Sequence, residues 1–216
     1  LGWISSIIQQ AEASQKRINE FLKEKSEINY NLNGLKKING SIEFKDVSFT
    51  YTESNIKAID KISFKLNNRK SLGIIGVTGS GKTTLIKLIT KIYNIEAGEI
   101  LFDNNSINEY DLECLRKQIG VVSQDSFLFS DSIINNIRFG KEKATMKEVE
   151  KVCKIAGIHN EIIKFSNGYE TILGERGINL SGGQKQRICI ARALIKEPKI
   201  LICLLYTSDA ADEEDS

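Results

Sequence analysis

The chain has 216 residues, of which 41% are hydrophobic and 27% charged, so it can bury the core of one large domain or of one domain with an appendage. The net charge of +2 is uneven, because five of the 28 acidic residues lie in the last fourteen positions; the rest of the chain holds 30 basic and 23 acidic residues, a net +7. Such a basic body suits polyphosphate ligands or an anionic surface. No run reaches the ~18 apolar residues of a membrane span, and no signal peptide is visible.

The four cysteines are scattered without the spacing of metal ligands, which argues against a zinc site or a disulfide framework and favours reduced thiols (Cys114, Cys153, Cys189 and Cys203). The chain opens Leu1-Gly2-Trp3 and its only methionine is Met146. We therefore expect an internal fragment of a longer product.

Residues 3–28 carry apolar side chains at three- and four-residue steps with charges between them, which predicts an amphipathic helix (Ile4, Ile7, Ile8, Ala11, Ile18, Phe21 and Leu22). Two interpretations stay open for this helix. It either packs on a core, or it is the cytoplasmic end of a membrane helix that leads into a soluble domain. The stretch 29–40, with Asn, Lys and Gly, reads as a linker.

Beyond residue 41 the apolar period becomes alternating, which predicts paired strands (Ile42, Phe44, Val47, Phe49 and Tyr51, then Ile62, Phe64 and Leu66). We expect an apolar strand at Leu72–Ile75, then a glycine loop, then a helix from about Lys82 to Tyr93. Two helical patterns and a final buried strand follow (145–165, 184–196 and Lys199–Ile202).

The segment GVTGSGKTT fits the phosphate-loop pattern G-x-x-x-x-G-K-[ST] with Gly76, Gly81, Lys82 and Thr83. Glycines are needed because the loop turns tightly while its N–H groups point at phosphate oxygens, and a Cβ would obstruct that approach. Lys82 would reach the β- and γ-phosphates, and the Thr83 hydroxyl would ligate Mg²⁺. The alternative is a chance glycine loop, but the strand expected before it and the helix expected after it favour a nucleotide site.

A second glycine motif, LSGGQKQRICIARALIKEP, lies about a hundred residues later. Ser181, Gly182 and Gly183 directly precede an amphipathic helix that Pro198 closes, so a hydroxyl, bare amides and a helix N-terminus form a second anion site. Two phosphate-binding motifs with one nucleotide loop suggest a second copy, in which each loop is covered by the other copy's motif. The alternative is a helix cap with no ligand.

Together, the loop at Gly76–Thr83 and the signature Leu180–Gln184 make residues 1–202 resemble the nucleotide-binding domain of an ATP-binding cassette (ABC) transporter. The resemblance implies an α/β fold: a P-loop NTPase core with an antiparallel β layer and an inserted helical subdomain, truncated before the core is complete. It divides the chain into a linker helix from the end of a transmembrane domain, a partial nucleotide-binding domain and a non-native tail (1–40, 41–202 and 203–216).

The resemblance also implies ATP and Mg²⁺ as cofactors. The nucleotide contacts it implies are a tyrosine that stacks on adenine, the phosphate loop and the signature (Tyr51, Gly76, Thr78, Gly79, Ser80, Gly81, Lys82, Thr83, Thr84, Ser181, Gly182, Gly183 and Gln184). Gln124 in VVSQDSFLF matches the family's glutamine that touches Mg²⁺ or the attacking water. Gln124 and Lys82 are therefore the catalytic candidates, and Thr83 and Gln124 the metal ligands. Without the family context, Tyr51 would read as a half-buried strand residue and Gln124 as a solvated loop residue.

Three further features follow from the resemblance. GERG at Gly174–Gly177 is similar to the stretch before the signature in exporters, where Glu175 would contact the coupling helices of the membrane domain; the alternative is a solvent-exposed carboxylate. QQAEASQKRINEFL resembles the junction that follows the last transmembrane helix in exporters with fused domains. We expect His159, the only histidine, to be structural, because the family's switch histidine belongs well downstream of this chain.

In the family, the strand after the signature helix ends in an Asp that holds Mg²⁺ and a Glu that polarises water, and these positions fall on Leu204 and Leu205. Asp209 lies five residues beyond Leu204, roughly 16 Å along an extended strand, too far to replace it. The tail CLLYTSDAADE resembles the translation of a transposase adapter used in sequencing libraries. We therefore expect the native reading frame to be lost at about residue 203; the alternative is a degenerate cassette with an acidic disordered tail.

The function implied is that of an ATPase cassette that powers a membrane exporter at the cytoplasmic face of the cell membrane, although this chain, without the two acids, is expected to have no turnover. The partners implied are a second nucleotide-binding domain and the coupling helices of a transmembrane domain, with no nucleic acid. Two alternatives stay open: a soluble ABC ATPase of translation or DNA repair, and a nonhydrolysing regulatory half-transporter.

Overall fold

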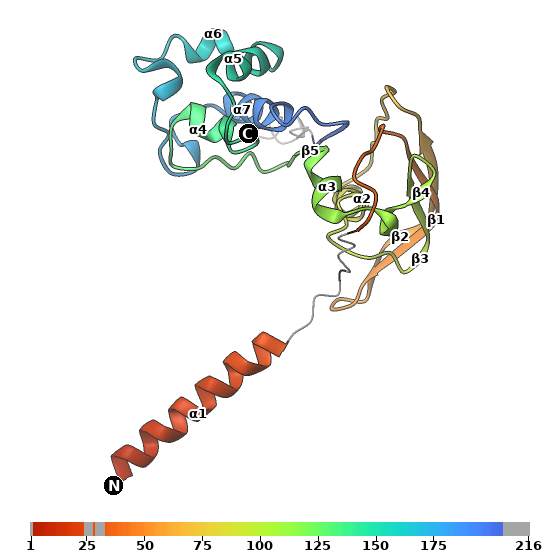
Figure 1. Cartoon of the computed structure of the whole chain (residues 1–216), viewed down its shortest axis with the longest axis vertical. Helices are drawn as coiled ribbons and strands as arrows, with labels where there is room; N and C mark the ends of the chain where they lie inside the picture. Colours follow the sequence, from red (N-terminus) through yellow and green to blue (C-terminus); the bar gives the residue numbers. More distant parts are fainter. Residues whose placement is uncertain (1, 24–27, 29–32, 205–216) are drawn as a thin grey trace, which may run out of the picture.

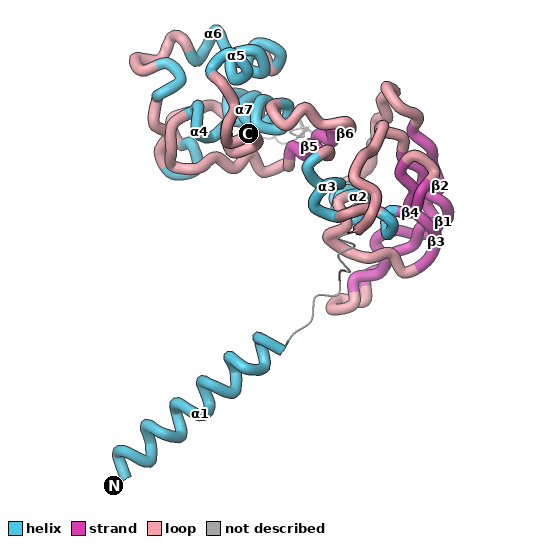
Figure 2. Tube along the Cα trace, in the orientation of Figure 1, coloured by secondary structure: helices cyan, strands magenta, loops and turns pink. Residues whose placement is uncertain are grey.

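The computed structural model describes residues 2–23, 28 and 33–204, and Figure 1 shows two lobes and a separate helix. One lobe holds an antiparallel sheet with α2 (Lys82–Ile89) and α3 (Leu112–Lys117) beside it. The other lobe is mostly helical, and the separate helix is α1 (Gly2–Lys23). Figure 2 shows that most of the strand structure lies in the first lobe.

The sheet lobe is built on four strands in the order β2-β1-β3-β4. The strand bounds are β1 Ile42–Tyr51, β2 Ile56–Leu66, β3 Ala97–Phe102 and β4 Asn105–Ser106. Strand β1 pairs antiparallel with both β2 and β3, and Phe44 lies opposite Phe64 on one side and Ile100 on the other. The Phe44 and Phe64 rings stack at 4.5 Å. The strand pairing predicted after residue 41 is therefore confirmed.

The core of this lobe lies between the sheet and α2. Leu85 and Leu88 of α2 are buried against Phe44 and Phe102 of the sheet. A short 3-10 turn, Ile107–Glu109, follows β4 and begins with a capping box between Ser106 and Glu109. The packing fixes the start of α2, and therefore the phosphate loop that precedes it, against the sheet.

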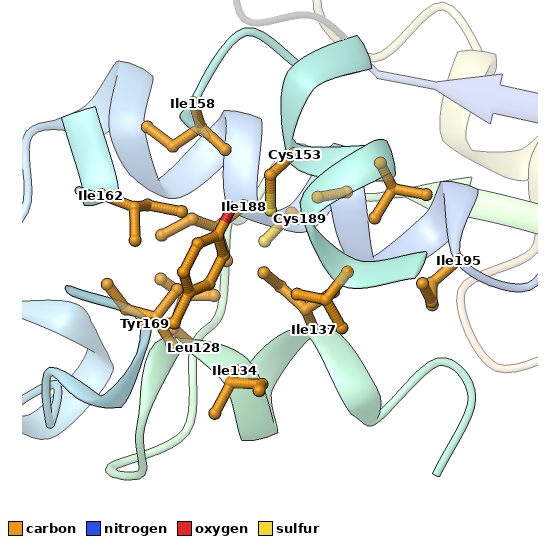
Figure 3. Packing of buried hydrophobic residues seen from close by; sticks show 14 of the residues in the cluster. Leu128, Ile134, Ile137, Cys153, Ile158, Ile162, Tyr169, Ile188, Cys189 and Ile195 are labelled. Carbon is orange, nitrogen blue, oxygen red and sulfur yellow. The ribbon is translucent and has the colours of Figure 1, made fainter. Parts of the chain in front are cut away.

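The helical lobe contains four helices and two 3-10 turns: α4 Ile133–Arg138, α5 Met146–Ile155, α6 His159–Ile162, α7 Gly182–Leu194, Gly168–Glu170 and Glu175–Gly177. Ser132, Thr145 and Ser181 each begin a helix, because their hydroxyls accept hydrogen bonds from first-turn N–H groups. Figure 3 shows the apolar cluster between these helices, in which Ile137 and Ile188 are fully buried. The lobe therefore has its own core.

A two-stranded parallel pair, β5 (Ile119–Val122) and β6 (Ile200–Cys203), connects the lobes. Ile119 and Ile200 lie in the core of the sheet lobe, whereas Val122 lies in the core of the helical lobe. The final strand predicted at Lys199–Ile202 is therefore present, one residue later. Its carboxyl end and that of β5 lie at the same edge.

The strand predicted at Leu72–Ile75 is wrong: residues 71–77 form no strand and are exposed. Ile75 is fully exposed, and Leu72 and Ile74 are about half exposed. An apolar strand is stable only between neighbours that complete its backbone hydrogen bonds. Among the described residues, β5 and β6 pair with each other and no strand lies beside this run.

Two predicted helices are shorter than expected. The helix predicted to reach Tyr93 ends at Ile89, because the Thr90 hydroxyl donates to the Ile86 carbonyl at 2.8 Å and Lys91 adopts a positive φ of 52°. The helical pattern over 145–165 is divided into α5 and α6 at Gly157, where φ is +71°.

Helix α1 forms as predicted but buries none of its residues, and Trp3 and Phe21 are more than three-quarters exposed. It does not pack on a core within the described chain. None of the described helices combines the length and the apolar character that a membrane crossing requires.

Candidate functional site

The phosphate loop turns through two glycines in the left-handed region, Gly79 at φ 82° and Gly81 at φ 89°. A Cβ on Gly81 would stand 2.5 Å from the carbonyl oxygen of Ala58 in β2, so only glycine fits there. Helix α2 begins at the next residue, Lys82. The sequence thus folds into an exposed loop that leads directly into a helix N-terminus, where backbone N–H groups remain without intrahelical partners.

The side chain of Lys82 is folded over this loop. Its Nζ donates to the Gly76 carbonyl at 2.5 Å, to the Val77 carbonyl at 2.8 Å and to Ser80 Oγ at 3.3 Å. All three acceptors are neutral, and none of the ion pairs of the described residues includes Lys82. The loop therefore encloses an unneutralised positive charge, which fits an anionic ligand such as a triphosphate.

The residues expected to hold Mg²⁺ fit the ion only in part. Thr83 lies exposed in the first turn of α2, so its hydroxyl is available. Gln124 is exposed two residues beyond the end of β5. The described residues include no cluster of three His, Cys, Asp or Glu side chains that could bind a metal. Mg²⁺ usually takes one or two protein ligands and completes its shell with water and phosphate oxygens, and Thr83 and Gln124 are consistent with that pattern.

Leu204, the position at which the resemblance predicts a metal-binding acid, lies where two parallel strands end. The Leu204 N–H donates to the Val122 carbonyl at 2.9 Å, so Leu204 extends β6 beside the end of β5. A side chain at this position shares an edge with Gln124, but a leucine supplies no oxygen. Leu205 and Asp209 lie outside the described residues.

Tyr51 ends β1, and its hydroxyl lies 3.0 Å from Thr84 Oγ1 in α2. The ring is half-buried, so part of its surface remains open near the phosphate loop. This contact joins two of the residues predicted to bind nucleotide, although they are 33 positions apart in sequence.

The signature motif forms the N-terminus of α7. Ser181 Oγ accepts from the Gln184 N–H at 3.3 Å, and Gln184 Oε1 accepts from the Ser181 N–H at 2.9 Å, which is a capping box. A Cβ at Gly182 would meet nothing within 4 Å. The glycine backbone at this helix end is therefore open to a ligand from outside.

Gln124 and the signature line one cleft. Its volume is about 520 Å³, and it lies between the loop after β5 and the start of α7 (Gln124, Asp125, Ser126, Phe127, Gly182, Gly183, Lys185 and Gln186). No hydrogen bond or ion pair within the described ranges joins the phosphate loop to the signature. One chain thus brings Gln124 to the signature but leaves the two glycine motifs apart.

Glu175 and His159, the two other residues singled out in the sequence, both lie in the helical lobe. Glu175 is exposed in the turn before α7, where it is accessible to a partner. His159 Nδ1 lies 2.8 Å from the Tyr169 hydroxyl, an internal contact of the helical lobe. Burial raises the pKa of the Tyr169 hydroxyl above its ordinary value, so this group keeps its proton.

One residue at the signature was not predicted. Glu161 of α6 accepts from Gln184 Nε2 at 2.8 Å and from Arg187 Nη2 at 2.5 Å, so it orients two side chains of α7. A lone carboxylate 23 residues before its partner carries no periodic signal, which is why the sequence did not indicate it.

Comparison with known proteins identifies the family. Residues 59–203 match the family model described as ABC transporter. The chain is 45% identical over 91% of its length to "Uncharacterized ABC transporter ATP-binding protein YfiB" of Bacillus subtilis (strain 168). It is 44% identical over 94% of its length to "Multidrug resistance-like ATP-binding protein MdlA" of Buchnera aphidicola subsp. Schizaphis graminum (strain Sg). It spans 34% and 35% of these two relatives.

A solved structure gives the same result. The structure titled "Structure of a bacterial Atm1-family ABC exporter with ATP bound" matches with a TM-score of 0.83 and 34% sequence identity. The match covers 91% of this chain and 34% of that one. The α/β fold expected from the glycine motifs, with its antiparallel layer and inserted helices, is therefore confirmed, and the chain belongs to the ABC transporter family.

Proposed function

We propose that this chain is the ATP-binding part of a membrane exporter, in which binding and hydrolysis of Mg-ATP drive two nucleotide-binding domains together and apart. The observation that carries the proposal is the phosphate loop, where Lys82, the first residue of α2, is unneutralised among backbone carbonyls. The relatives' names support the export role, because they include multidrug-resistance-like proteins and an Atm1-family exporter.

Each part of the site has a role in the proposed mechanism. The amides of residues 76–81 and the Lys82 ammonium would hold the phosphates, and Thr83 and Gln124 would hold Mg²⁺, which would neutralise developing phosphate charge. Tyr51 stacks on the base. The signature amides at Gly182 and Gly183 cover the nucleotide of a second copy, which accounts for the separation of the two motifs in one chain.

The proposed partners are therefore a second nucleotide-binding domain and a transmembrane domain at the cytoplasmic face of the cell membrane. Glu175, exposed beside the signature helix, would contact the coupling helices. Helix α1 (Gly2–Lys23) would lead from the last transmembrane helix. A soluble cassette of translation or DNA repair has no observation in its favour.

A second candidate function, ATP binding without hydrolysis, does have an observation in its favour. Leu204, directly after β6, lacks the oxygen that a hydrolysing cassette needs there, which favours a chain that binds ATP without turnover. This describes a nonhydrolysing half-transporter if Leu204 is native, and a cassette with an altered tail if it is not. Resequencing the gene across codon 202 from genomic DNA separates the two.

We expect Lys82→Ala to weaken ATP binding by at least tenfold in isothermal titration of the purified chain, because it removes charge-assisted hydrogen bonds worth about 1.5–3 kcal/mol. Lys45→Ala is the matched control, because Lys45 is an exposed lysine of β1 paired with Glu99 at 3.6 Å. Its ATP affinity should equal that of the unmodified chain. Equal affinity in Lys82→Ala would contradict the proposal.

The same purified chain is expected to show no ATP turnover, because position 204 provides no oxygen for the metal. A phosphate-release assay checks this with Lys82→Ala as the blank. Turnover that disappears in Lys82→Ala would refute the expectation.

A further inference from the structure

Three aromatic rings meet beside the phosphate helix. The Tyr51 ring stands nearly perpendicular to Phe49 (4.9 Å, 82°) and to Tyr93 (5.5 Å, 87°), and Phe49 and Tyr93 lie 5.3 Å apart. Phe49 and Tyr51 come from β1, whereas Tyr93 follows α2 by four residues. Edge-to-face contacts of this kind fix the tilt of a ring as well as its position.

The opposite end of the Tyr51 side chain is also fixed. Its hydroxyl lies 3.0 Å from Thr84 Oγ1, and Thr84 is buried in the first turn of α2. The ring is therefore held by its contacts with two other rings and, at its hydroxyl, by the phosphate helix.

A cation stands against the same rings. Lys87 Nζ is 5.7 Å from the centroid of Tyr51 and 5.5 Å from that of Tyr93. Lys87 takes part in none of the ion pairs of the described residues. Its interaction with both tyrosines holds the two rings in a common arrangement.

The exposure of the rings distinguishes this cluster from ordinary core packing. Phe49 is 7% exposed and belongs to the core, but Tyr93 is 36% exposed and Tyr51 is half-buried. A ring held rigidly at the surface, beside a phosphate-binding loop, is prepared for a planar partner.

We propose that Tyr93 is a positioning residue for the nucleotide base: together with Lys87 it holds the Tyr51 ring ready to stack on the base. The inference rests on the proposed function, because it presumes that the phosphate loop binds ATP. Without Tyr93, the Tyr51 ring must lose its rotational freedom when the nucleotide binds, which lowers affinity for the base but leaves the phosphate contacts intact.

The test compares two ligands that share phosphates and differ in the base. ATP and inorganic tripolyphosphate are titrated calorimetrically into the chain, Tyr93→Ala and Tyr93→Phe. Tyr93→Ala is expected to lose ATP affinity three- to tenfold, equivalent to about 0.7–1.4 kcal/mol, with tripolyphosphate affinity unchanged. Tyr93→Phe is expected to keep both affinities, because the ring provides the contacts. Ile92→Ala, on the same turn and 50% exposed, is the matched control and should match the unmodified chain.

The outcomes separate the two proposals. An equal loss of affinity for ATP and for tripolyphosphate in Tyr93→Ala overturns the inference, because the ring would then have only a structural role. An unchanged ATP affinity in Tyr93→Ala overturns it as well. A Tyr93→Phe variant as weak as Tyr93→Ala also overturns it. If the unmodified chain binds neither ligand, the proposed function itself fails and this inference fails with it.

Discussion

At the scale of single residues, position 204 decides whether a carboxylate is available as a metal ligand in the proposed nucleotide site. Gln124 and Leu204 follow neighbouring parallel strands at one edge, the first with an amide oxygen and the second with a hydrocarbon side chain. A metal ion at this edge would find the Gln124 amide oxygen but no oxygen from Leu204.

A carboxylate at position 204 should therefore make ATP affinity depend more strongly on Mg²⁺. In Leu204→Asp we expect the ratio of ATP affinity with Mg²⁺ to that with EDTA to rise roughly three- to tenfold over the unmodified chain, because a hard oxygen ligand favours Mg²⁺. Cys203→Asp is the control, since the same charge one residue earlier points to the opposite face of β6. Identical ratios in all three proteins would contradict the proposed metal position.

At the scale of elements, helix caps explain why the helical lobe forms where it does. Thr145 and Glu148 make a capping box at the start of α5, with Glu148 Oε2 accepting from the Thr145 N–H at 2.7 Å. Lys141 Nζ donates to Glu148 Oε1 at 2.6 Å, and this hydrogen bond, with those from Thr145, lowers the pKa of Glu148 to about 2. The cap and the Lys141 contact therefore stabilise the ionised form of Glu148.

The stability of the chain should depend on the pH for this reason. The pKa of Glu148 is lower in the folded than in the unfolded chain, so its contribution is complete above about pH 4.5 and is lost as the pH falls toward about 2. Glu148→Gln is expected to reduce the slope of the free energy of unfolding against pH within this window, as measured by urea denaturation. Glu142→Gln changes an exposed acid of the preceding turn and should keep the original slope. An unchanged slope in Glu148→Gln would disprove the role of the cap.

At the scale of the whole molecule, the two lobes each bury their own core, but residues 71–77, which lead into and begin the phosphate loop, stay exposed. Ile75 is fully exposed and Val77 is 79% exposed, while Leu72 and Ile74 are about half exposed. Exposed apolar runs of this kind without paired backbone promote association between chains. This exposed segment, rather than either sheet, is therefore the surface at which another chain can pair.

We accordingly expect the purified chain to self-associate at micromolar concentrations, and Ile75→Lys to shift it toward the monomer in size-exclusion chromatography with light scattering, because a charge opposes pairing at that position. Ile172→Lys is the control, since Ile172 is 71% exposed but lies in the helical lobe. A monomeric unmodified chain, or equal shifts in both variants, would count against this expectation.

Local patterns in the sequence were enough to predict the family, the phosphate loop and the signature, because each motif consists of residues within a few positions of one another. The glycines at 79 and 81, the lysine after them and the Ser181–Gln184 capping box all form from neighbouring residues. Helix and strand positions followed from apolar periods for the same reason, although their ends depended on details such as the Thr90 hydroxyl.

The tertiary structure alone decided how distant segments meet. The contacts of Tyr51 with Thr84 and Tyr93, and of Glu161 with Gln184, join residues far apart in sequence, so no local pattern indicates them. Whether an apolar run becomes a strand depends on its neighbours, which is why Lys199–Ile202 was confirmed as β6 beside β5 whereas Leu72–Ile75 was not. Periodicity records what a segment can bury, but burial itself requires a partner surface, and only the folded chain determines where that surface lies.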